Sequence, residues 1–152
     1  MKVVVQRVAR AEVRVGGRGV ARIGPGMLLL ACVEKGDDAA AAEHLAERVA
    51  GLRFFPDADD RMNVAAREAG AAALVVSQFT LAADGRKGRR PSFDRAAPPE
   101  VAEPLVARFA ARLAELGLPV ATGVFGARME VELVNDGPVT FFLEERPAAG
   151  AG

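Results

Sequence analysis

Residues 2–15, KVVVQRVARAEVRV, decide the fold because their apolar and polar side chains alternate along the chain. A period of two is typical of a β-strand that buries one face. Gly16-Gly17 follows as a hairpin signal, and residues 20–23 resume the strand pattern. Gly24-Pro25-Gly26 then turns the chain into an apolar run at 27–33, which predicts a buried strand. The first third of the chain is therefore predicted to be β-structure.

A first amphipathic helix is predicted to start at residue 38 and to end near Gly51, with Asp37 or Asp38 as its cap. Apolar residues recur at helical spacing along this stretch, at Ala41, Leu45, Val49 and Leu52.

A second helix is predicted from about 98 to 116, and Gly117 and Pro119 stop it. Pro104 either kinks this helix or marks its true first turn. Its predicted apolar face consists of Val101, Leu105, Phe109, Leu113 and Leu116.

Strand patterns also surround the helices. Short strands are predicted at 52–55 and 73–76, and the last third of the chain alternates again at 120–125, 129–133 and 139–144. No internal repeat or linker separates two domains. We therefore predict one α+β domain over residues 1–145, layered β/β/α, followed by a disordered small-residue tail at 146–152.

Composition narrows the class of protein. Apolar residues make up 51% of the 152 and charged residues 26%, a balance typical of a globular domain. Lys plus Arg equal Asp plus Glu at 20 each, so any nucleic-acid contact is expected to be local. The longest apolar run, 27–33, is far shorter than the roughly 20 residues that cross a bilayer. We expect a cytoplasmic protein with no membrane partner, in which the single Cys32 is buried and inert.

Familiar catalytic groups are scarce. The only histidine, His44, falls on the polar side of the first helix, so a serine or cysteine triad has no base. The acidic cluster of Asp57, Asp59 and Asp60 lacks the spacing of an EF-hand loop and indicates a solvated turn. We predict no metal and no cofactor.

Three features have two interpretations each. The loop at 85–91 is basic, and residues 84–95 hold five basic and two acidic side chains. It is either a solubilising loop or a phosphate clamp, with equal weight on composition alone. Gly137-Pro138 is either a β-turn, the better local explanation, or a cis bond of unusual geometry. Arg7, within an apolar strand, either faces solvent, the better local explanation, or is buried against carbonyl or carboxylate partners.

In order along nearly the whole chain, several segments resemble the D-aminoacyl-tRNA deacylase family. They are Gln6-Arg7-Val8, residues 52–55, Ser77-Gln78-Phe79-Thr80-Leu81, Lys87-Gly88 with Arg90-Pro91-Ser92-Phe93, residues 123–129, and residues 135–140. The resemblance implies a homodimeric, deacylase-type β-roll with two main helices. It implies a hydrolase that acts at the 3′ end of aminoacyl-tRNA and releases free D-amino acid and tRNA.

The resemblance also replaces two of the local interpretations. It implies that Gly137-Pro138, with a cis peptide bond, reaches into the partner's active site, where backbone carbonyls occupy the space of an L side chain. Arg7 is then the donor that orients this segment. A pocket that excludes L side chains cannot exclude a substrate with none, so glycine mischarged on tRNA(Ala) is a further expected substrate.

The resemblance gives the catalytic role to Ser77, Gln78, Phe79 and Thr80, beside the ester. Backbone N–H groups around Phe79 and Thr80 are expected to bind the carbonyl oxygen as it gains negative charge. Thr80 is the nucleophile by residue type but has no base to activate it. The alternative implied by the family is hydrolysis assisted by the substrate's own terminal ribose hydroxyl.

Binding residues follow from the same resemblance. Phe125 and Met129 are expected to line the pocket for the terminal adenosine, although core packing explains Phe125 equally well on residues alone. Lys87, Arg89 and Arg90 are candidate phosphate contacts. Two rival functions remain: an RNA-binding module without catalysis, and a small-metabolite hydrolase with a pocket around Thr80.

Overall fold

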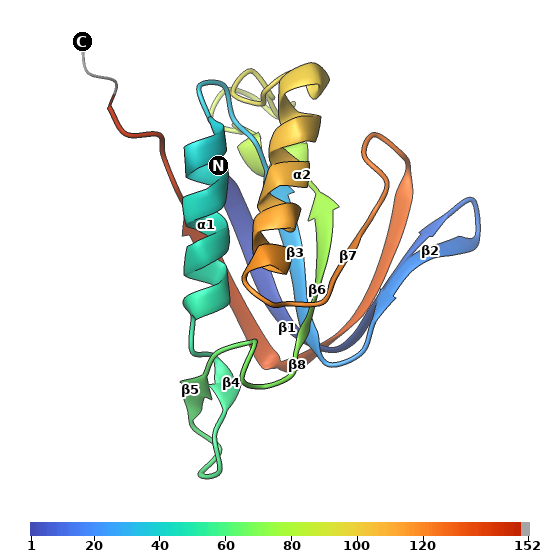
Figure 1. Ribbon diagram of the computed structural model, residues 1–152. Coiled ribbons are helices and arrows are strands. Elements are labelled where there is room, and N and C mark those ends of the chain that lie inside the picture. The colour runs from blue at the N-terminus through green and yellow to red at the C-terminus, as the bar shows by residue number, and fades with distance from the viewer. Residues whose placement is uncertain (150–152) are drawn as a thin grey trace.

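The computed structural model describes residues 1–149, in which two helices cover one face of a curled, mixed β-sheet (Figure 1). The strands are β1 (Lys2–Val15), β2 (Arg18–Ile23), β3 (Gly26–Cys32), β4 (Phe55–Pro56), β5 (Met62–Val64), β6 (Ala72–Ser77), β7 (Val120–Thr122) and β8 (Met129–Glu144). The helices are α1 (Ala39–Gly51), α2 (Pro99–Glu115) and the short 3₁₀ helix η1 (Phe79–Ala82). The predicted α+β class with two main helices is confirmed.

The long strand β1 organises the sheet, whose order is β2-β1-β3-β6-β7. β3 and β2 pair antiparallel with the two halves of one edge of β1, and β8 pairs antiparallel along its other edge. β6 and β7 continue the sheet in parallel. Because β2 also contacts β6 and β7, the sheet curls into a partial barrel.

Two apolar cores result. The larger lies between the sheet and the helices, where Leu45 and Phe109 meet Val5 and Leu29, and the smaller lies inside the curl of the sheet. β3 contributes to both cores, so it is buried on both faces, as its uninterrupted apolar run predicts. β1 changes face between them, because its pairing register with β8 shifts at residues 6–10.

The helix boundaries follow the sequence closely. Asp38 caps α1, since its Oδ1 accepts the backbone N–H of Ala41 at 2.8 Å. α2 begins at Pro99, so Pro104 lies inside the helix rather than in its first turn. Val101, predicted to face the core, is 39% exposed, and Ala102 is buried instead.

Two predicted strands are also corrected. Instead of a strand at 52–55, Phe55–Pro56 pairs with Met62–Val64 in a separate hairpin, whose turn contains Asp57. Asp57 Oδ1 accepts the N–H groups of Asp59 and Arg61, which agrees with a solvated turn. The predicted break at Gly137-Pro138 is absent, because β8 runs through it as one strand of 16 residues.

After β8 the described chain continues to residue 149. Residues 146–149 of the predicted tail form no helix or strand, and residues 150–152 lie outside the described residues. Among residues 1–149, no helix is long and apolar enough to span a membrane.

Candidate active site

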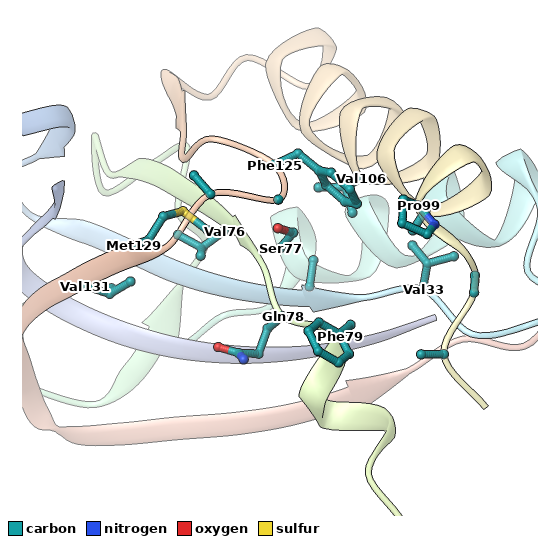
Figure 2. Close-up of a pocket in the computed structure, with 16 residues that line it drawn as sticks. Val33, Val76, Ser77, Gln78, Phe79, Pro99, Val106, Phe125, Met129 and Val131 are labelled. Carbon is teal, nitrogen blue, oxygen red and sulfur yellow. The ribbon is translucent and has the colours of Figure 1, made fainter. Parts of the chain in front are cut away.

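A pocket of about 500 Å³ opens where β6 ends, between the start of α2 and the segment that joins β7 to β8 (Figure 2). Ser77, Gln78 and Phe79 line one side, and Phe125 and Met129 line another. Figure 2 shows Ser77, Phe125 and Met129 around the same space. The structure thus brings together five of the residues that the sequence predicts for the site.

The wall at Ser77 to Phe79 is formed where a strand passes into a helical turn. Gln78 continues the parallel pairing for one residue, because its N–H donates to Ala31 O at 2.7 Å, and η1 begins at Phe79. The first N–H groups of such a turn have no partner inside it. This end of the strand therefore presents backbone donors beside the pocket.

Phe125 and Met129 reach the pocket from the β7–β8 connection. Gly123 anchors that connection through its N–H, which donates to Val75 O at 2.9 Å. A Cβ on Gly123 would lie 2.7 Å from Met129 Sδ, so glycine is needed for Met129 to pack there. Phe125 both lines the pocket and packs against the larger core.

Thr80 does not line the pocket. Its side chain is exposed, and Gln78 Nε2 donates a hydrogen bond to Thr80 Oγ1. The residues that do line it, all within the described chain, include no carboxylate, imidazole, amine, guanidinium or thiol. His44 is exposed on α1, as predicted. The pocket therefore offers hydroxyl, amide and backbone groups but no titratable side chain.

Cys32, the last residue of β3, is fully buried. Its Sγ is 3.7 Å from Phe79 O. Burial, together with the charge of Glu34, raises the pKa of the Cys32 thiol from 9.0 to about 11. The thiol is therefore neutral at physiological pH, which agrees with the inert role predicted for it.

Arg7 lies opposite a bulge in β8. Gln6 pairs with Thr140 and Val8 with Asn135, so the four residues at 136–139 lie opposite Arg7 alone. The Asn135 side chain closes the bulge, because its Oδ1 accepts the Val139 N–H at 2.8 Å.

The Arg7 side chain is only 12% exposed. Its Nε donates to Asp136 O at 3.0 Å, and its Nη1 donates to Phe54 O at 2.7 Å. The solvent-facing interpretation of Arg7 is therefore wrong.

Gly137 and Pro138 are exposed at this bulge and are joined by a cis peptide bond, as the resemblance implies. Gly137 has φ +141°, and a Cβ there would lie 2.6 Å from Val139 Cγ2 and 3.3 Å from Arg7 Nη2. Neither residue lines the pocket of its own chain, and neither does Arg7. Within one chain these three residues therefore form a separate group.

The candidate phosphate contacts Lys87, Arg89 and Arg90 are exposed in the loop between η1 and α2. They do not line the pocket. The loop is closed at its base by paired backbone hydrogen bonds between Asp84 and Ser92, both 2.8 Å. Arg86 pairs with Asp84, and its hydrogen bonds hold the pKa of that carboxyl well below its usual range.

Sequence reasoning missed the third wall of the pocket, which comes from α2 and the residues before it. Ala97, Ala102 and Val106 line this side. The spacing of Ala102 and Val106, one helical turn apart, was the available signal, but larger side chains at Val101 and Leu105 obscured it.

Comparisons with known proteins agree with this geometry. The family model described as D-Tyr-tRNA(Tyr) deacylase matches residues 4–144. A "D-aminoacyl-tRNA deacylase" of Symbiobacterium thermophilum is 60% identical, with 95% of each chain covered. One of Paracoccus denitrificans is 56% identical, over 98% of this chain and 100% of that protein.

Solved structures with the same fold include a "c-Myc DNA Unwinding Element Binding Protein", with TM-score 0.90 and 39% identity over 97% of this chain and 100% of that one. A "probable eukaryotic D-amino acid tRNA deacylase" has TM-score 0.79 at 18% identity, over 94% of this chain and 98% of that one, which shows a likeness of fold. The class of protein is thus a hydrolase. Within that class, the chain belongs to the D-aminoacyl-tRNA deacylase family.

Proposed function

We propose that the pocket at the end of β6 hydrolyses the ester bond of D-aminoacyl-tRNA, with the terminal adenosine against Phe125 and Met129 and the ester beside Ser77, Gln78 and Phe79. The observation that carries the proposal is the pocket's lining, which combines apolar walls with the end of a strand and has no titratable side chain. An aminoacyl ester is already activated, so positioning and an oxyanion site suffice to speed its hydrolysis.

In this mechanism, water attacks the carbonyl carbon of the ester. Backbone N–H groups of Phe79 and Thr80 bind the oxygen that becomes negative. The bond to the ribose oxygen then breaks, that oxygen takes a proton, and free amino acid and tRNA leave. Because no side-chain base lines the pocket, the neighbouring ribose hydroxyl of the substrate assists the transfer of the proton.

The proposal assigns selection of the D enantiomer to Gly137 and Pro138 of a second copy of the chain. In a homodimer, these residues enter the partner's pocket and their carbonyls take the space that an L side chain needs. Their exposure, their absence from the pocket of their own chain, and the outer edge of β8, which pairs with no strand among residues 1–149, support this arrangement. Arg7 fixes the direction of the segment through Asp136 O.

Exclusion of L side chains by backbone leaves no means to exclude a substrate without a side chain. Glycine mischarged on tRNA(Ala) is therefore a second proposed substrate. Glycyl-tRNA that is equally stable with and without the protein would contradict this part alone.

The first test is deacylation of D-tyrosyl-tRNA beside L-tyrosyl-tRNA by the purified protein. Loss of only the D ester supports the proposal. Salt-sensitive tRNA binding with no deacylation would favour an RNA-binding module. Equal rates on tRNA and on simple D-aminoacyl esters would favour a small-metabolite hydrolase.

A mixing experiment tests the shared site. Ser77→Phe places an aromatic ring in the pocket, and Gly137→Ala displaces the carbonyls that, in this proposal, also face the α-ammonium group of the substrate. Each variant alone is therefore expected to be inactive. After both are unfolded and refolded together, a mixed dimer has one intact pocket facing one intact Gly137-Pro138, and activity returns to about a quarter of wild type. If each chain completes its own site, no activity returns.

A further inference from the structure

Two exposed phenylalanines form a pair at the mouth of the pocket. Phe79 is 57% exposed and Phe93 is 37% exposed. Their ring centroids are 5.2 Å apart and the ring planes meet at 67°, an edge-on arrangement. Phe79 also lines the pocket, so the pair extends the apolar surface of the pocket outward.

The backbone holds both rings in place. Phe79 begins η1, and the Phe93 carbonyl accepts the N–H of Ala96 at 3.0 Å. Ser92, next to Phe93, is fixed by its two backbone hydrogen bonds to Asp84. An exposed aromatic surface that is already ordered binds a flat ligand at a lower entropic cost.

Basic side chains accompany this pair. Lys87, Arg89, Arg90 and Arg95 belong to the same loop as Phe93 and are exposed. None of them forms an ion pair within 4.0 Å with another residue in the part of the chain that the structure describes. Aromatic faces beside unneutralised cations are typical of surfaces that bind single-stranded nucleic acid, in which bases stack and phosphates meet Lys or Arg.

We infer that Phe79 and Phe93 form a stacking platform for the unpaired base that precedes the terminal adenosine of tRNA. This inference rests on the proposed position of that adenosine, since Phe79 continues from the pocket that would hold it. The platform takes a polynucleotide strand, and the cations of the same loop meet its phosphates. Stacking tolerates any base, so it supplies affinity for the strand without selecting the amino acid.

Binding of uncharged tRNA tests the platform without requiring catalysis. Phe93→Leu removes the aromatic face and is expected to raise the Kd about five- to ten-fold, while Phe93→Tyr keeps the wild-type Kd. For tRNA trimmed of its last two nucleotides, wild type and Phe93→Leu are expected to bind equally. Phe142→Leu, at a phenylalanine on β8 that is 56% exposed, is the control and is expected to change neither Kd.

Kinetics separate this inference from the proposed function. Phe93→Leu is expected to raise KM for D-tyrosyl-tRNA to a similar extent with kcat unchanged, and to leave hydrolysis of D-tyrosyl-adenosine as in wild type. Equal Kd values for Phe93→Leu and wild type on intact tRNA overturn the inference. A Phe93→Leu protein whose oligomeric state differs from that of wild type also overturns the inference. The two rings would then lie in a contact between copies of the chain and not on a surface open to tRNA. Failure of wild type to hydrolyse either D ester overturns the proposed function but leaves the binding result valid.

Discussion

Arg7 Nε donates to the backbone carbonyl of Asp136 at 3.0 Å, across a bulge that sets four residues of β8 opposite this single residue of β1. Its Nη1 donates in a different direction, to Phe54 O at 2.7 Å. One guanidinium therefore joins the bulge to the segment before β4. The residue held this way immediately precedes Gly137, so the bulge is fixed where it is most exposed.

Arg7→Met is expected to lower the free energy of unfolding by about 1.5–3 kcal/mol, because two backbone carbonyls lose a charged donor. Urea denaturation measures this change. Arg10→Met is the matched control on the same strand, since the Arg10 side chain is 57% exposed in its pair with Glu132 and its loss is expected to cost less than about 1 kcal/mol. If both variants lose the same small amount of unfolding free energy, Arg7 contributes no more to stability than the exposed ion pair of Arg10 and Glu132.

Gly137→Ala is expected to destabilise the fold by about 1–3 kcal/mol, because an L residue at φ +141° is strained and its Cβ meets Val139. Gly24→Ala is the control, since Gly24 is exposed and no atom lies within 4 Å of its Cβ position, and a change within about 0.5 kcal/mol is expected. Thermal denaturation of both variants and of wild type measures these changes. Equal melting temperatures would mean that the bulge relaxes around the methyl group.

The sequence was sufficient for the elements whose pattern is local. The uninterrupted apolar run of β3 indicates burial on both faces, and both faces are buried. Asp38 marks the start of α1, because its side chain caps the helix. Phe55 pairs with Val64 nine residues later, and the intervening polar residues carry no period that reveals this pairing. The local interpretation of Gly137-Pro138 as a β-turn is wrong, because nothing in the neighbouring sequence shows that these residues form a bulge in β8 or that Arg7, 129 residues earlier, donates to Asp136 O.

The site was predictable in the same uneven way. Ser77, Gln78, Phe125 and Met129 were found through the resemblance, and the structure places them around one pocket. Thr80 belongs to the same motif, but its side chain is exposed and does not line the pocket. Ala102 was not predicted, because small residues contribute little to the apolar periodicity by which a buried helix face is recognised. At a small residue, however, the helix backbone can come closest to a pocket.

Because of Cys32, the free energy of unfolding is expected to fall as the pH rises above 9. Burial raises the pKa of its thiol to about 11, so between the unfolded value of 9.0 and that value the unfolded chain binds fewer protons than the folded one. The stability is fully present below pH 9 and is lost as pH rises toward 11. Urea midpoints measured from pH 8 to 11 should fall more steeply for wild type than for Cys32→Ala, and parallel curves would contradict the assignment.

Glu132 is expected to act at the opposite end of the pH range. Hydrogen bonds from Arg10, and then from Arg14, lower the pKa of this carboxyl from 4.5 to about 2. Its contribution is present above pH 4.5 and is lost as pH falls toward 2. In a plot of melting temperature against pH, Glu132→Gln should therefore show a smaller fall between pH 4.5 and 2 than wild type does. The difference between wild type and Glu132→Gln should shrink in 1 M salt, because the ion pairs of Glu132 with Arg10 and Arg14 are exposed and salt screens them.

Thr80→Val distinguishes a side-chain nucleophile from a site built of backbone groups. The hydroxyl of Thr80 lies outside the pocket and accepts a hydrogen bond from Gln78, and no base lines the pocket to activate it. We therefore expect kcat/KM on D-tyrosyl-tRNA to fall by less than about five-fold in Thr80→Val, whereas loss of a true nucleophile costs several orders of magnitude. Ser77→Phe gives the contrast, because its aromatic ring occupies the pocket and is expected to abolish most of the activity. If Thr80→Val is as inactive as Ser77→Phe while its melting temperature is unchanged, the threonine hydroxyl takes part in the reaction and the backbone mechanism is wrong.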